Sequence, residues 1–281
     1  MRETRYARPV GGHPGESELL TGRSICTSHY MVIPRTVMRD IVTSRLPFWR
    51  ETRLWVLARP LSGFAETFSH YVLEVEPGGG SDEPELDMGV EGVLFITHGQ
   101  CTIEIGDQAM TLESGGYAYI AAGSRWNLRA EDGAGTCVFH WIRKRYEVVP
   151  GHESPRTFFT RESEVTPESM PDTDGRWTTT RFVDPDDMRH DMHVNIVNFA
   201  PGSSIPFLET HVMEHGLYIL EGKGTYCLNN DWVEVEAGDF IWLRAFCPQA
   251  CYAGGPGPFR YLLYKDVNRH ARLWSADKMT L

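Results

Sequence analysis

The sequence lacks an apolar run long enough to cross a membrane, because no stretch approaches the ~18–20 residues that a bilayer-spanning helix needs. Its N-terminal segment, MRETRYARPVGGHPGESELLTG, is polar and has no signal-peptide core. Clusters of Lys and Arg are also missing, and 27 basic residues against 38 acidic ones leave a net charge of −11. Such a chain repels phosphate backbones. These absences predict a cytoplasmic protein without nucleic-acid or membrane partners.

Paired cysteines are absent as well. The six cysteines form no CxxC pair, and Cys247 and Cys251 are four apart, which matches no common zinc spacing. We therefore expect free structural thiols. Amphipathic helical patterns are scarce, whereas 27 Gly and 17 Pro separate short aromatic or β-branched segments such as Tyr71–Val75 and Val194–Phe199. Many short strands between turns predict an all-β sandwich or jelly roll.

Two halves of the chain resemble each other. A length of 281 residues favours about two domains. With a constant offset of 123 positions, HGLYILEG aligns with GVLFITHG, and VEAGDFIWL aligns with LESGGYAYI. This repeat predicts two copies of one β fold. We expect an N-terminal arm (1–50), a first barrel (51–146), an exposed linker rich in Pro, Glu, Ser and Thr (147–180) and a second barrel (181–281).

The densest chemical signal is the segment from Glu209 to His215. Glu209 and His211 are two apart, so in a strand both face the same side, and His215 follows an expected tight turn. Two imidazoles and one carboxylate are a ligand set for a divalent transition metal. A lone histidine on a strand is more often a surface or core residue, but three candidate ligands in an apolar sheet favour a metal site. Glu214 should face away from His215, which indicates a structural role.

The spacing of this segment resembles a known motif. The residues from Gly202 to Gly222 resemble the first cupin motif, with Glu209 at the position of its first His and His215 at the position of its Glu. The residues from Gly238 to Gln249 resemble the second motif, with Gln249 replacing the usual His. A set of Glu, two His and Gln suits Mn²⁺ better than Zn²⁺ or Cu²⁺ because it is rich in oxygen.

The first copy has lost these ligands. The offset of 123 places Leu86, Met88, Gly92 and Trp126 at the four ligand positions, and none of them is a plausible ligand. We therefore expect the first barrel to be structural, supporting the second barrel or an oligomer interface.

A narrower resemblance covers nearly the whole chain. The segments ETHVMEHGLYILEGKGTYCLNNDWVEVEAGDFIW, RYLLYKDVNR and GGYAYIAAGS, with the region of Gln249, are similar to the (S)-ureidoglycine aminohydrolase family of bicupins. Bacterial members are also called allantoin-linked or glyoxylate-induced proteins. The resemblance implies two double-stranded β-helix barrels and Mn²⁺-dependent release of ammonia from (S)-ureidoglycine, giving (S)-ureidoglycolate in purine and allantoin breakdown. Ala121 and Ala122 replace a Pro-Pro pair of the family, in the copy without ligands.

The same resemblance implies residue roles. The metal ligands would be Glu209, His211, His215 and Gln249, and the substrate contacts would be Tyr226, Tyr261, Lys265 and Glu209. Glu209 and Lys265 would be the catalytic residues. Tyr261 and Lys265 alternate along one strand and therefore share a face. Without the resemblance, Lys265 would be interpreted as a solvated lysine and Tyr226 as a core aromatic residue.

Two other functions stay open. Two His and one carboxylate also occur in non-haem Fe(II) oxygenases, so a cupin dioxygenase acting on a small organic acid is one alternative. Gln249 argues against it because a fourth protein ligand takes a position that O₂ needs. A non-catalytic bicupin that binds a small acid is the other, although four intact ligands disfavour it. The expected partners are a small-molecule substrate and further copies of this chain in a homo-oligomer.

Overall fold

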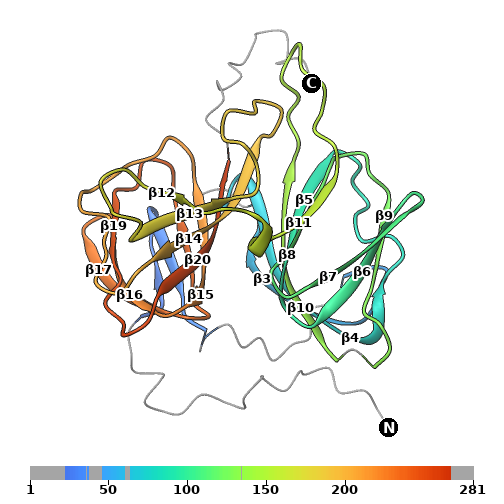
Figure 1. The fold of residues 1–281 in the computed structure, drawn as a ribbon, viewed down its shortest axis with the longest axis horizontal. Helices are drawn as coiled ribbons and strands as arrows, with labels where there is room; N and C mark the ends of the chain where they lie inside the picture. The colour runs from blue at the N-terminus through green and yellow to red at the C-terminus, as the bar shows by residue number, and fades with distance from the viewer. Residues whose placement is uncertain (1–22, 36, 38–45, 61–63, 134, 267–281) are drawn as a thin grey trace.

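Two barrels of antiparallel β-strands lie side by side in the computed structural model (Figure 1). The ordered elements among the described residues are β-strands and a short 3₁₀ helix (Glu162–Glu164). None of the described segments forms a helix long and apolar enough to span a bilayer. The predicted all-β fold with two barrels is confirmed. The structure describes residues 23–35, 37, 46–60, 64–133 and 135–266.

The first barrel is a nine-stranded sheet. Its strands are β3 (Trp49–Ala58), β4 (Phe68–Ser81), β5 (Val90–His98), β6 (Gln100–Ile105), β7 (Gln108–Glu113), β8 (Gly116–Ile120), β9 (Trp126–Arg129), β10 (Cys137–Arg145) and β11 (Phe158–Arg161). They pair in the order β11-β8-β5-β10-β4-β9-β6-β7, with β3 also on β4. The sheet bends into a barrel because the long β4 pairs with β10 along its first part and with β9 at its end, whereas β3 pairs with both parts of β4.

The second barrel combines an eight-stranded and a three-stranded sheet. Its strands are β1 (Ile25–Cys26), β2 (Tyr30–Ile33), β12 (Glu168–Ser169), β13 (Trp177–Arg181), β14 (Met192–Phe199), β15 (His215–Glu221), β16 (Lys223–Leu228), β17 (Asp231–Glu236), β18 (Phe240–Leu243), β19 (Gln249–Tyr252) and β20 (Phe259–Asp266). The larger sheet has the order β1-β2-β18-β15-β20-β14-β13-β12, and the smaller one has the order β17-β16-β19.

Segments outside the expected barrel ranges complete both sheets. From the arm (1–50), β2 pairs with β18, so the blue N-terminal strands lie in the orange and red barrel of Figure 1. Tyr30 of this arm is buried in the second core and its hydroxyl donates to Asp231 Oδ2 at 2.6 Å. From the expected linker (147–180), β11 pairs with β8 of the first barrel, whereas β12 and β13 extend the sheet of the second. This segment therefore connects the barrels and also adds one strand to the first sheet and two to the second.

An apolar layer between the barrels is the third core of the molecule. Along β14, Met192, Val194 and Ile196 pack in this layer with residues of the first barrel. Val197 and Phe199 face the opposite way, into the second barrel. The neighbouring strands β20 and β15 follow the same alternation. The odd-numbered side chains of these three strands therefore point into the second barrel.

The glycines of the repeat hold equivalent backbone positions. Gly99 has a φ of 69° and Gly222 a φ of 82°, a region that favours glycine. A Cβ on Gly99 would lie 2.4 Å from the carbonyl oxygen of Thr136, and one on Gly222 would lie 2.0 Å from that of Pro258. Each barrel therefore needs a glycine where its chain turns against the neighbouring strand.

Glu214 ties the second barrel to the first. Its buried carboxylate accepts hydrogen bonds from the backbone N–H of Glu66 at 3.1 Å and of Thr67 at 2.5 Å, both in the first barrel. Trp242 Nε1 of the second barrel donates to the same carboxylate at 2.9 Å. The structure therefore turns Glu214 away from the second barrel's interior, as its sequence position indicates.

Glu91, which the repeat aligns with Glu214, makes a similar connection in the other direction. Its carboxyl accepts a hydrogen bond from the Tyr119 hydroxyl at 2.5 Å. Burial, followed by its hydrogen bond with Asp191, raises the pKa of Glu91 well above its usual range. Asp191 of the second barrel is paired with Lys144 at 2.7 Å. Glu91 and Asp191 therefore meet across the interface.

Removing the Glu214 carboxylate should destabilise the molecule. Glu214→Ala leaves buried donors of both barrels without their acceptor, so we expect the free energy of unfolding to fall by about 3–5 kcal/mol in urea denaturation. Glu221→Ala is the matched control, because Glu221 is the last residue of β15 and its side chain is 49% exposed. The control should change stability by less than about 1 kcal/mol. Equal losses in the two variants would contradict the role of Glu214.

Candidate active site

Glu209 and Gln249 are held opposite each other by the backbone. The N–H of Glu209 donates to the carbonyl of Gln249 at 2.9 Å, and the N–H of Gln249 donates to the carbonyl of Glu209 at 2.9 Å. This reciprocal antiparallel pair puts both side chains on one side of the sheet. Gln249 Nε2 lies 3.4 Å from Glu209 Oε1. The structure thus brings together two residues that are forty positions apart in the sequence.

The two histidines lie next to this pair. His211 Nε2 is 3.4 Å from Glu209 Oε1, and the rings of His211 and His215 stack with centroids 4.8 Å apart. His215 begins β15, where its Nδ1 lies 3.2 Å from the carbonyl oxygen of Met213. Burial, then the neighbouring His211 and Lys265, lower the pKa of His215 to about 3. His215 is therefore neutral at pH 7, the form that binds metal ions.

The donor atoms of this cluster fit a metal ion. Gln249 Oε1 is buried and has no hydrogen-bond partner among the described residues. An amide oxygen, a carboxylate and two imidazoles are a mixed oxygen and nitrogen set of the kind that Mn²⁺ accepts. Within the described ranges, no three His, Cys, Asp or Glu side chains lie close enough together to hold one ion. The close pairs Glu209–His211 and His211–His215 share His211, so the set is partly assembled.

The residues expected to contact substrate lie in the same barrel. Tyr226 and Tyr261 are buried, and the hydroxyl of Tyr226 donates to that of Tyr261 at 3.2 Å. Burial raises the pKa of both phenols well above the usual value, so both are neutral donors. Lys265 pairs across the sheet with His215. Burial and then Arg181 lower the pKa of Lys265, whereas Glu209 raises it.

Three inward-facing residues were not identified as site residues from the sequence. His193 and Asn195 of β14 and Cys251 of β19 also face the interior of the second barrel. Burial raises the pKa of Cys251 to about 12, so its thiol stays neutral. The sequence does carry a signal for the first two, because His193-x-Asn195-x-Val197 alternates like a strand with one inward face.

Aromatic side chains fill the corresponding space of the first barrel. The Trp141 ring packs against Trp126 and Trp49, with centroids 5.8 Å away in both cases. Gly92, at the position of His215, leaves room for it, because a Cβ on Gly92 would lie 2.9 Å from Trp141 Nε1. Arg143 lies over the Trp141 ring at 4.8 Å. The first barrel therefore has a tryptophan where the second has its candidate ligands.

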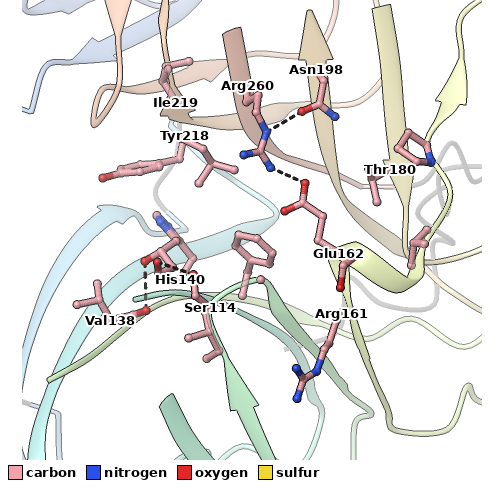
Figure 2. Close-up of a pocket in the computed structure, with 18 of the residues that line it drawn as sticks. Ser114, Val138, His140, Arg161, Glu162, Thr180, Asn198, Tyr218, Ile219 and Arg260 are labelled. Atoms are coloured by element: carbon pink, nitrogen blue, oxygen red, sulfur yellow. Dashed lines mark hydrogen bonds and ion pairs between the residues drawn. The ribbon is translucent and has the colours of Figure 1, made fainter. Parts of the chain in front are cut away.

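A separate cavity of about 940 Å³ lies between the barrels, and Figure 2 shows the residues that line it. Arg260 extends into it from β20 and donates to Asn198 Oδ1 at 2.7 Å. The Arg260 guanidinium also pairs with Glu162 and, at 3.3 Å, with Glu221. These residues belong to the outer face of the sheet, opposite the candidate ligands. Two carboxylates compensate the Arg260 charge, so the chemistry favours the barrel interior as the active site.

The fold and both motifs define a class of protein. Residues 195–264 match the Cupin domain family, and residues 62–146 match the EutQ-like cupin domain family. The chain is therefore a bicupin, as predicted, with one cupin in each barrel.

Relatives specify the family. The chain is 31% identical over 277 residues to (S)-ureidoglycine aminohydrolase of Escherichia coli (strain K12), covering 95% of this chain and 99% of the relative. It is 31% identical to (S)-ureidoglycine aminohydrolase of Arabidopsis thaliana, covering 82% of this chain and 74% of that protein. It therefore belongs to the (S)-ureidoglycine aminohydrolase family, and the predicted enzyme class, a hydrolase, is confirmed.

A solved structure agrees with this assignment. The crystal structure of a glyoxylate-induced protein from Pseudomonas aeruginosa is 61% identical and superposes with a TM-score of 0.88. The match covers 97% of this chain and 100% of the other chain. The fold is therefore shared over nearly the full length.

Because aromatic side chains fill its interior, we expect the first barrel to contribute to stability and not to metal binding. Trp141→Leu removes a buried ring and should lower the free energy of unfolding by about 2–4 kcal/mol. Bound metal, measured by elemental analysis of the folded variant, should not change. A loss of metal that accompanies normal folding would contradict a purely structural first barrel.

Proposed function

We propose that this chain is an Mn²⁺-dependent enzyme that releases ammonia from (S)-ureidoglycine and gives (S)-ureidoglycolate. The observation that carries the proposal is the placement of Lys265 beside Glu209, His211 and His215 inside one barrel. This combination would supply a metal site and a cation in the interior of one barrel. The relatives named (S)-ureidoglycine aminohydrolase supply the substrate, an amino acid with a carboxylate, an amine and a ureido group on one carbon.

Four residues would hold the ion: Glu209, His211, His215 and Gln249. When bound, Mn²⁺ supplies a Lewis acid and a template for the substrate. Gln249 would present its unpartnered Oε1, and its Nε2 contact with Glu209 would be exchanged for that arrangement. Side-chain rotation of His211 and His215 would complete the set.

The remaining pocket residues orient the substrate. Lys265 pairs with the substrate carboxylate, and this anion favours the charged form of a lysine whose pKa is lowered by burial. Tyr261 donates a hydrogen bond to the same group, because it lies on the same face of β20. Glu209 accepts a hydrogen bond from the substrate amine. Contacts at three points fix one enantiomer.

The reaction exchanges an amine for a hydroxyl on one carbon. The C–N bond breaks, and ammonia leaves with the electron pair. A C–O bond forms from water to the same carbon, and the proton that the water loses balances the one that the leaving amine gains.

The first test is ammonia release from freshly generated (S)-ureidoglycine, corrected for spontaneous decay. Chelator-treated protein should be inactive, and Mn²⁺ should restore rapid formation of (S)-ureidoglycolate. Glu209→Ala should lose bound metal and at least about a hundredfold of the rate. Glu234→Ala is the matched control, because Glu234 lies on the exposed face of β17 and pairs with Lys223.

Two outcomes would overturn the proposal. The first is full activity of Glu209→Ala. The second is no metal-dependent ammonia release by protein shown to hold Mn²⁺. Oxygen uptake with Fe(II) would then indicate the dioxygenase alternative, and tight binding of a small acid without turnover would indicate a binding protein.

Lys265 gives a second prediction. Lys265→Met keeps the length of the side chain and removes its cation, so substrate binding should weaken about tenfold to a hundredfold in KM. The metal content should be unchanged, because Lys265 is not a ligand in this proposal. Steady-state kinetics together with elemental analysis measure both effects. An unchanged KM would remove Lys265 from substrate binding.

A further inference from the structure

One wall of the second barrel, formed by β14, begins with two inward-facing polar side chains. His193 and Asn195 lie on β14 with the same facing as Val197 and Phe199, which belong to the core of this barrel. Both polar residues are buried, with 3% and 2% of their surface exposed. The two side chains therefore project toward the candidate active site from a strand that carries no candidate ligand.

Each of these side chains has an unpartnered polar atom. Neither His193 Nε2 nor Asn195 Oδ1 has a hydrogen-bond partner among the described residues. A buried polar group without a partner costs about 1–3 kcal/mol, so such atoms are rare unless a ligand or water completes them. Two on one wall, both facing the pocket, indicate a surface built to bind a polar group.

Strand register places this wall beside the expected substrate contacts. His193 pairs with Lys265 across β14 and β20, and Lys265 pairs in turn with His215 across β20 and β15. Asn195 lies opposite Leu263, one step further along the same inward row. A metal ligand, the lysine and His193 therefore follow one another across the sheet. The polar side chains of β14 therefore begin next to Lys265, the residue proposed to bind the substrate carboxylate.

His193 and Asn195 carry no charge, and the neighbouring Arg181, which pairs with Asn195 across β13 and β14, forms an ion pair with Glu168 at 2.9 Å. Burial, followed by the cations of Lys265, His190 and Arg181, lowers the pKa of His193 to about 4, whereas Asp187 opposes this shift. His193 is therefore a neutral imidazole at pH 7, and Asn195 is a neutral amide. Together they offer both donors and acceptors. Such a surface is complementary to an uncharged group with N–H and C=O groups rather than to a carboxylate.

We propose that His193 and Asn195 bind the ureido group of the substrate, an inference that rests on the function proposed above. Lys265 and the metal ligands take the charged end of the molecule, and the neutral wall takes its ureido end. Asn195 Oδ1 accepts a hydrogen bond from the terminal NH₂, and His193 contacts the remaining polar edge. These residues thereby select ureido compounds over other small amino acids.

A pair of stable probes tests this selection. N-carbamoylglycine keeps the carboxylate and the ureido group without the reactive amine, and N-acetylglycine has a methyl group in place of the terminal NH₂. Titration calorimetry of the Mn²⁺-loaded protein should show about tenfold to a hundredfold tighter binding of N-carbamoylglycine. Asn195→Leu, which is nearly isosteric, should reduce this ratio to about one. His193→Phe should reduce it as well.

A matched variant on the same strand controls for general effects. Asn198→Ala changes the same residue type on the opposite face of β14, where Asn198 accepts a hydrogen bond from Arg260. It should keep the ratio of the wild-type protein. If Asn195→Leu lowers the melting temperature below the assay temperature, Asn195→Ala replaces it. Metal content is measured in every variant, so a lost ligand is distinguished from a lost ureido contact.

The outcomes separate this inference from the proposed function. Ammonia release by the wild-type protein, combined with an unchanged probe ratio in Asn195→Leu and His193→Phe, would overturn the inference and leave the function intact. No preference for N-carbamoylglycine in the wild-type protein would overturn it too. A preference that both variants abolish, in protein that releases no ammonia, would support the ureido wall while the aminohydrolase proposal fails.

Discussion

The packing of one barrel against the other is the constraint on which the rest of the structure depends. β14, β15 and β20 are covered on both faces, by the apolar layer on one side and by the barrel interior on the other. Glu214 reinforces this layer with buried hydrogen bonds to the first barrel, and Lys144 of the first barrel pairs with Asp191 of the second. Strands fixed on both faces hold their inward side chains in a defined register, which a metal site requires.

The two barrels share a fold and differ in the side chains that face their interiors. Both barrels keep the glycines at Gly99 and Gly222, because the backbone there needs a positive φ and space. At the equivalent inward position the first barrel has Gly92 and the second has His215. The glycine admits the ring of Trp141, which closes the first barrel to ligands. In the proposed function, a change of side chain on the same fold therefore decides which barrel carries chemistry.

Much of the fold could be predicted from the sequence because its signals are local. Strand alternation and the constant offset predicted two similar barrels, and the turn at Asn229 has the positive φ that its residue type tolerates. The arm was not predictable in the same way. β2 pairs with β18, more than two hundred positions away, and such a pairing leaves no mark in the local pattern. The ligand assignment at Glu209, His211, His215 and Gln249 stays a prediction.

The sequence by itself determined the chemistry that is available: the donor set, the inward alternation of Tyr261 and Lys265, and the absence of ligands in the first copy. Tertiary structure decided which groups meet. His193 belongs with Lys265 and His215 only because three strands from distant parts of the chain pair in one register. Side-chain direction follows from neighbouring residues, whereas proximity between strands depends on packing of the whole sheet. For that reason a pocket wall can be evident in the fold and inconspicuous in the sequence.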